Sequence, residues 1–208
     1  LPMPYSQSQP MKIESVDLAP RGVSEKLVKI RAAGLCHSDL STINGDRPRQ
    51  LPMVLGHEAS GEVVELGAGV NDLKIGDHVV MIFAATCGHC LPCVEGRPTH
   101  CEPGQAANGA GLLMGGVSRL SQNGAKVHHH MGVAAFAEYT VAHRGSMVKV
   151  DSSLPFEEAA LFGCAVLTGV GAVVNTAKVS AGSTVAVVGL GGVGLNSVLG
   201  AVLAGARE

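Results

Sequence analysis

The chain has 208 residues, a formal net charge of −2 and only 15% charged residues. Such a balance indicates no nucleic acid and no anionic membrane surface as a partner. The length allows one large domain or two small ones. Hydrophobic residues make up 46% and glycine fills 28 positions, so the chain is expected to bury much of its surface and to turn often.

No charged segment followed by an apolar one opens the chain, so no secretory signal peptide is predicted. Residues 1–4 read Leu-Pro-Met-Pro without an initiator methionine, which indicates processing or trimming. The six cysteines are spaced like metal ligands, and without a secretion signal they indicate thiolates in a reducing compartment. The expected location is the cytoplasm.

From about residue 11 to residue 150 the pattern is that of short strands. Residues 27–31, 62–66 and 78–83 partly alternate between apolar and polar side chains, and Gly, Asn or Asp bounds each run. Short strands with frequent turns predict an antiparallel barrel or sandwich. Residues 101–136 are rich in Gly, Ala, Asn and Ser and predict an extended surface loop. Its histidines, at 128–130, are expected to be solvated or hydrogen bonded rather than to bind a metal.

A helix is predicted to begin at Pro155, because Glu157 and Glu158 suit the positive end of its dipole. Cys164 would lie within this helix or just after it. Residues 183–188 then predict a strand, residues 189–194 a glycine turn, and residues 195–204 a buried helix. The chain stops one strand and one helix into a βαβ unit, so we expect it to be part of a longer protein.

Two stretches, 159–177 and 184–206, contain no charged residue and are long enough to span a membrane. The second stretch divides into a β-branched run, a glycine turn and a small-residue helix. Buried parallel strands and the helices that cover them are equally apolar. The sequence therefore favours a buried βα unit over membrane spans.

Four cysteines follow one another with two, two and seven intervening residues: Cys87, Cys90, Cys93 and Cys101. Two residues between ligands let neighbouring sulfurs converge on one ion, and the longer gap lets the chain return with the fourth. Sites closed by four protein ligands are structural. An iron–sulfur cluster is an alternative, but its fourth cysteine usually follows after three residues and precedes proline. Unbound buried cysteines are the other alternative. The spacing favours a structural zinc ion.

Cys36, His57 and Cys164 form a second, three-ligand set with a vacant position, which is typical of catalytic zinc. The wide separation of these residues is weak evidence, because a lone histidine in a barrel is more often a hydrogen-bonded core residue. Asp39 strengthens the interpretation, since it could accept the other ring N–H of His57 and orient that ring.

The pattern Gly189-x-Gly191-x-x-Gly194 follows the strand and opens the helix predicted above. In this context it predicts that a pyrophosphate binds at the helix N-terminus. A purely structural glycine turn is the alternative. The acidic residue that would distinguish NAD from NADP is expected about 20 residues further on, beyond residue 208.

These motifs together resemble the zinc-dependent medium-chain alcohol dehydrogenases, in the long-loop branch that includes liver-type and aryl-alcohol enzymes. Gly56-His57-Glu58-x2-Gly61-x5-Gly67-x2-Val70 fits the zinc signature of that family. The resemblance covers essentially the whole chain but only the N-terminal part of the family's length. It implies a mixed α/β fold with a GroES-like antiparallel β-barrel catalytic domain at 1–165, whose structural zinc lobe spans about 84–104. The first βα unit of a Rossmann domain would follow at 166–208.

The resemblance also implies roles for individual residues. Two zinc ions would be bound, one by Cys36, His57 and Cys164 and one by the four-cysteine set, and hydride would pass from an alcohol to NAD or NADP. Ser38 would hand the alcohol proton into a relay, and Glu58 would lie behind the metal. Phe83 matches a wall of the substrate pocket. Positions that match cofactor contacts are His37, Thr168, Gly189, Gly191, Gly192, Val193 and Gly194.

The sequence departs from the family in two places. Many relatives end the proton relay with a histidine five residues after the first ligand, where this chain has Ser41, so the proton would leave through water. Relatives that oxidise the glutathione adduct of formaldehyde carry an anion-binding arginine shortly after the last structural cysteine. Here residues 102–105 are Glu-Pro-Gly-Gln, which disfavours that substrate.

The sequence therefore predicts an NAD(P)-dependent zinc alcohol dehydrogenase acting on a small primary or aromatic alcohol, homo-oligomeric when complete. The alternatives are a zinc-stabilised domain without turnover and another zinc-binding medium-chain dehydrogenase. An iron–sulfur electron carrier is a further alternative that a colourless preparation would exclude.

Overall fold

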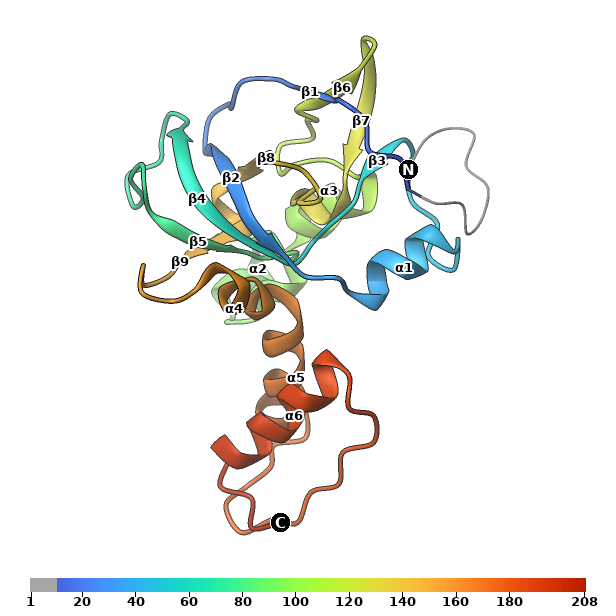
Figure 1. The fold of residues 1–208 in the computed structure, drawn as a ribbon. Helices are drawn as coiled ribbons and strands as arrows, with labels where there is room; N and C mark the ends of the chain where they lie inside the picture. Colours follow the sequence, from blue (N-terminus) through green and yellow to red (C-terminus); the bar gives the residue numbers. More distant parts are fainter. Residues whose placement is uncertain (1–10) are drawn as a thin grey trace.

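A computed structural model describes residues 11–208, so the expectation for residues 1–4 falls outside the described residues. A five-stranded antiparallel sheet forms the centre of the molecule and curls around a core (Figure 1). Its strands, in sheet order, are β8 (Tyr139–His143), β2 (Glu25–Ala33), β4 (Ala59–Leu66), β5 (His78–Met81) and β9 (Met147–Lys149). The predicted strands at 27–31 and 62–66 are confirmed, and the third ends at Met81 rather than at Phe83.

A second sheet of four short strands covers one side of the barrel. Its order is β1 (Asp17–Leu18), β6 (Leu120–Gln122), β7 (Ala125–His129) and β3 (Met53–Val54). The pair β3 and β7 is parallel, so the predicted antiparallel barrel contains one parallel pair. The core enclosed by the five-stranded sheet is mostly small and β-branched, with Val28, Val63 and Val79 among its members, and a smaller cluster lies against the second sheet. This core provides the rigid support from which the site residues project.

The predicted surface loop at 101–136 is wrong. After a short helix α3 (Glu102–Ala110), strands β6 and β7 form a hairpin across Asn123 and Gly124, both of which have positive φ. An Asn-Gly pair is the preferred two-residue hairpin turn, because both positions adopt left-handed conformations. The histidines at 128–130 are at most 8% exposed, since β7 lies inside its sheet between β6 and β3.

The remaining short helices lie around the barrel. They are α1 (His37–Ile43), α2 (Leu91–Val94) and the 3₁₀ turns η1 (Pro98–His100), η2 (His130–Gly132) and η3 (Arg144–Ser146). Cysteines occupy the N-cap positions of α1, α2 and α3, at Cys36, Cys90 and Cys101. Three of the candidate metal ligands thus lie directly before the first turn of a short helix.

One long helical stretch, Phe156–Thr176, leads away from the barrel (Figure 1). It consists of α4 (Phe156–Leu161), the π-helical turn η4 (Phe162–Val166), α5 (Leu167–Gly171) and a second π turn η5 (Ala172–Thr176). By length and composition it is the one helix among residues 11–208 that could cross a membrane. Its first half packs on the barrel: a Cβ added to Gly163 would lie 2.1 Å from the carbonyl oxygen of Met81.

The predicted strand at 183–188 does not form a ladder in the described part of the chain. Residues 183–188 have no regular secondary structure, and two backbone hydrogen bonds join them to the end of the chain, from the N–H of Val185 to Glu208 and from the N–H of Arg207 to Ser183. A parallel strand needs neighbouring strands of several residues, and here only the last two residues lie beside it. The helix predicted at 195–204 forms as α6 (Gly192–Leu203) and packs on α5. The expectation that it is buried is wrong, because only Gly200 and Ala201 of this helix are buried.

Lys26 in β2 is fully buried, and its Nζ has no hydrogen-bond partner. Burial, reinforced by the charge of Arg144, lowers the pKa of Lys26 from 10.5 to about 7, and Asp72 offsets only part of this effect. Between these two values the unfolded chain holds a proton that the folded chain releases. The free energy of unfolding therefore increases as the pH rises through this window.

Replacing Lys26 by methionine should raise the free energy of unfolding by about 1 to 4 kcal/mol near pH 7, because it removes an unpaired buried charge. The gain should shrink as the pH approaches 10, where the native lysine is already neutral. Urea unfolding of both proteins at several pH values measures this difference, with Lys29→Met as the control. A gain that stays constant with pH would contradict the explanation.

Candidate metal centres

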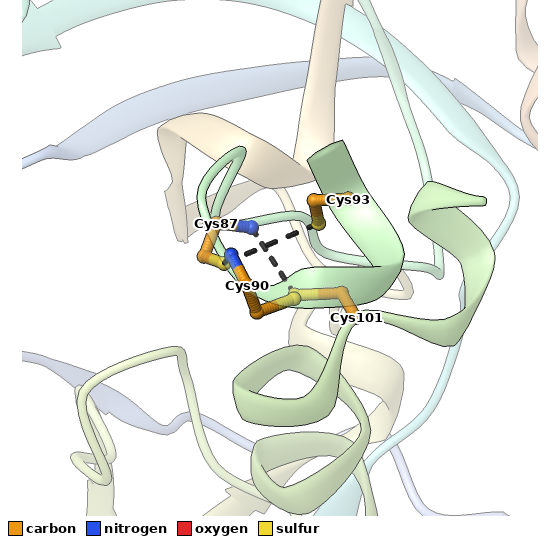
Figure 2. Close-up of side chains that lie close together, drawn as sticks. All are labelled: Cys87, Cys90, Cys93 and Cys101. Atoms are coloured by element: carbon orange, nitrogen blue, oxygen red, sulfur yellow. Dashed lines mark hydrogen bonds between the residues drawn. The ribbon is translucent and has the colours of Figure 1, made fainter. Parts of the chain in front are cut away.

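The four cysteines predicted to form one site lie together in the structure (Figure 2). Their sulfur atoms all lie within 4.8 Å of one another, and the sulfurs of Cys87 and Cys93 are 4.0 Å apart. Four sulfurs at 2.3 Å from a tetrahedral zinc ion are separated by about 3.8 Å. The described geometry therefore fits a structural Zn²⁺ site.

Backbone N–H groups point at these sulfurs. The N–H of Cys87 donates to Sγ of Cys101 at 3.2 Å, and those of His89 and Cys90 donate to Sγ of Cys87 at 3.5 and 3.3 Å. Hydrogen bonds from His89 and Cys90 outweigh the effect of desolvation and lower the pKa of Cys87 to about 6. Burial and the neighbouring thiols raise the pKa of Cys93 to about 11. One thiol of the cluster therefore loses its proton readily, whereas a second thiol retains its proton. A bound cation would stabilise the further thiolates.

The second predicted set also converges, although its members come from distant parts of the chain. Cys36 precedes α1, His57 precedes β4, and Cys164 lies in the π turn η4. Their ligand atoms lie within 4.8 Å of one another, and the two sulfurs are 3.9 Å apart. π turns inside helices occur frequently at functional sites. Two thiols and an imidazole at this spacing fit a three-ligand zinc site of the catalytic kind.

Asp39 lies beside His57, as the sequence predicts. Its Oδ2 is 3.1 Å from Nδ1 of His57, and its Oδ1 accepts the N–H of Gly56 at 3.1 Å. Burial alone would raise the pKa of Asp39, but hydrogen bonds from His130 and His57 hold it well below its usual range. A charged Asp39 favours the tautomer of His57 that carries its proton on Nδ1, which leaves Nε2 free to bind a metal.

His130 is a site residue that the sequence reasoning missed. Its Nδ1 lies 3.0 Å from Oδ1 of Asp39, and its side chain is fully buried. We expected it on a surface loop because its segment is rich in small and polar residues. The signal that could have placed it correctly is the Asn123–Gly124 turn, which predicts that the flanking residues pair as strands.

The other predicted catalytic residues lie around this second set. The hydroxyl of Ser38 is half-buried, and Nη1 of Arg47 lies 3.5 Å from it. Glu58 is 2% exposed and its Oε1 has no partner, and burial raises the pKa of its carboxyl. The ring of Phe83 meets that of His57 edge-on, with 6.1 Å between centroids.

The predicted cofactor residues fall into two groups. His37 is exposed at the start of α1, where its Nδ1 lies 3.3 Å from Oγ of Ser41. The glycine turn lies at the N-terminus of α6, beside α5. Gly189 has a φ of +94°, and a Cβ on Gly194 would lie 1.8 Å from the carbonyl oxygen of Gly189, so both positions require glycine.

The glycine turn lies next to the second ligand set. A Cβ added to Gly192 would be 3.4 Å from Cβ of Ala165, the residue that follows Cys164. Val193 contacts the same helix, since its carbonyl oxygen would be 2.4 Å from a Cβ on Gly169, next to Thr168. Thr168 and Val193 are thereby brought to one region, although their predicted contacts with a cofactor remain a prediction.

Residues 22–152 match the family of alcohol dehydrogenase GroES-like domains. The chain belongs to this family, within the zinc-dependent medium-chain alcohol dehydrogenases. It is 45% identical over 205 residues to S-(hydroxymethyl)glutathione dehydrogenase of Synechocystis sp., which covers 98% of this chain and 54% of that protein. The chain thus spans about half the length of the curated relatives that it matches.

Solved structures of the family share the fold. The alcohol dehydrogenase zinc-binding domain protein from Burkholderia ambifaria superposes with a TM-score of 0.91 at 36% identity, over 98% of this chain and 55% of that one. Benzyl alcohol dehydrogenase from Acinetobacter calcoaceticus superposes with a TM-score of 0.89 at 33% identity, with the same coverage. The mixed α/β fold predicted from the sequence is confirmed by these matches.

Replacing Cys93 by serine should remove one zinc ion per chain and lower the free energy of unfolding by at least about 4 kcal/mol, because a structural metal stabilises the fold directly. This corresponds to a fall of roughly 8 to 16 °C in melting temperature. Elemental analysis and thermal unfolding measure both effects. Cys36→Ser is the matched control and should lose the other ion at a smaller cost in stability. Unchanged metal content in Cys93→Ser would contradict the assignment.

Proposed function

We propose that the protein containing this chain is an NAD(P)-dependent zinc alcohol dehydrogenase that interconverts a primary or aromatic alcohol and its aldehyde. The observation that carries the proposal is the convergence of Cys36, His57 and Cys164 beside the glycine turn at 189–194. Zn²⁺ held by such a set acts as a Lewis acid on an alcohol oxygen. The neighbouring turn is where a dinucleotide would bind, so the donor and the acceptor of hydride would meet in one place.

Other residues of the chain would have separate roles in the reaction. Asp39 orients His57, and Glu58 places a second carboxyl behind the ligands, held uncharged more easily because it is buried. Ser38 is the proposed proton acceptor for the alcohol. Arg47 only donates hydrogen bonds, so its contact leaves the hydroxyl hydrogen of Ser38 available to another acceptor. His37, exposed at the start of α1, would meet the pyrophosphate.

We also propose that the chain divides into a catalytic domain at 1–165 and the start of a Rossmann domain at 166–208. The boundary falls inside the continuous helix Phe156–Thr176, which would then connect the two domains rigidly. The location proposed is the cytoplasm, which agrees with six free thiols in the described residues. A homo-oligomer is proposed for the complete protein.

The names of the relatives point to two different classes of substrate. Benzyl alcohol dehydrogenase supports an aromatic substrate, and S-(hydroxymethyl)glutathione dehydrogenase would support a glutathione adduct. Glu102 and Gln105 occupy the first turn of α3, where an arginine would be needed to bind the anionic adduct. The charge of this turn therefore favours a neutral primary or aromatic alcohol.

The proposal is tested by assaying NADH or NADPH formation by the whole protein. We expect turnover of benzyl alcohol or a simple primary alcohol, with S-(hydroxymethyl)glutathione the poorer substrate by kcat/KM. The control is Cys164→Ser, which should abolish turnover while the four-cysteine site keeps its metal. Absence of hydride transfer in the zinc-loaded whole protein would favour the alternative of a zinc-stabilised domain without turnover.

Ser38→Ala in the whole protein should lower kcat by about 10²-fold or more, the usual contribution of a positioned proton acceptor. The pH dependence of kcat should flatten, because the step that loses the proton no longer passes through this hydroxyl. Ser38→Thr keeps the hydroxyl and should restore most of the rate. A pH–rate profile of Ser38→Ala that matches the native one would overturn the role of Ser38.

A further inference from the structure

A third buried histidine packs against the three-ligand set without belonging to it. His130 begins the turn η2 directly after β7, and its side chain is fully buried. Its ring meets the ring of His57 at 86°, with 5.3 Å between centroids. The two imidazoles are therefore neighbours, although 73 positions separate them in the sequence.

Both histidines face the same carboxylate. Nδ1 of His57 lies 3.1 Å from Oδ2 of Asp39, and Nδ1 of His130 lies 3.0 Å from Oδ1. The N–H of Gly56 donates to Oδ1 at 3.1 Å. Each oxygen of Asp39 thus has an imidazole nitrogen within 3.1 Å, so the two histidines contact one carboxylate through its two oxygens.

This arrangement makes the orientation of His57 depend on His130. Asp39 is 3% exposed, so water cannot replace a lost partner easily. Without the nitrogen of His130, only the N–H of Gly56 would hold Oδ1, and the carboxylate could rotate about its Cβ–Cγ bond. Partners that hold a ligating histidine in its tautomer and direction typically contribute 10- to 100-fold to metal affinity.

We infer that His130 is a positioning residue for the metal ligand His57, acting through Asp39. The inference rests on the proposed function, in which Cys36, His57 and Cys164 bind zinc. In this arrangement His130 faces Oδ1 of Asp39, Asp39 faces Nδ1 of His57 through Oδ2, and Nε2 of His57 is left for the metal position beside the two cysteines. The buried turn after β7 thus contributes to a site whose ligands come from other elements.

The test compares three substitutions in the 208-residue chain loaded with zinc. His130→Phe keeps an aromatic ring and loses the nitrogen. His130→Asn keeps an N–H donor close to the position of Nδ1, whereas His130→Gln carries its amide one bond further out. His129→Gln is the control, because His129 is the buried last residue of β7, directly before His130, and its Nε2 accepts the N–H of Arg119.

Competition with a chromogenic chelator gives the affinity of each zinc ion, and Cys93→Ser and Cys36→Ser identify which ion belongs to which site. We expect His130→Phe and His130→Gln to weaken the three-ligand site about 10- to 100-fold, with the four-cysteine site unchanged as evidence of folding. His130→Asn and His129→Gln should stay close to the native affinity. If His130→Phe fails to fold, the difference in zinc affinity between His130→Asn and His130→Gln decides the test.

Equal affinity of the three-ligand site in all variants would overturn the inference. Equal loss in the Asn and Gln variants would also overturn it, since it would assign His130 to direct metal binding. If the proposed function itself is wrong, the result is different. The native chain then binds no zinc ion at the three-ligand site, so Cys36→Ser has the same zinc content as the native chain.

Discussion

Sulfur atoms converge at two points, one formed by cysteines within residues 87–101 and one by cysteines from distant parts of the chain, and the second convergence joins several elements of the structure. Cys36 and Cys164 are 128 positions apart, yet their sulfurs lie 3.9 Å from each other. Thiolates at this distance repel, so such pairs are stable in ionised form only around a cation. One ion would thereby fix α1 and the long helix Phe156–Thr176 against the barrel, which makes the metal part of the architecture as well as of the chemistry.

Contacts of Asp39 and Ala165 connect the three-ligand set to other elements of the structure. Asp39 joins α1 to the barrel through His57 and to the end of β7 through His130. Ala165 brings the glycine turn of α6 against the helix that carries Cys164. The candidate ligands, their supporting carboxylate and the proposed cofactor turn therefore lie in one contact network.

The sequence predicted that each set of candidate ligands converges, because cysteine spacing and the Gly-His-Glu pattern reflect local geometry and family constraints. The contact between Asp39 and His57 was also predicted, since a histidine ligand commonly needs a carboxylate partner. His130 was placed wrongly, because segment composition outweighed the Asn123–Gly124 turn that folds β7 into the second sheet. The strand at 183–188 was overpredicted, because its β-branched residues favour a ladder that depends on neighbouring strands, and propensity alone cannot supply those neighbours.

The most direct test of this account is the identity and number of metal ions in the purified chain, determined by elemental analysis. The account predicts two zinc ions per chain, one for each convergence of sulfur atoms. Iron in place of zinc, or a folded chain that binds no metal, would contradict it.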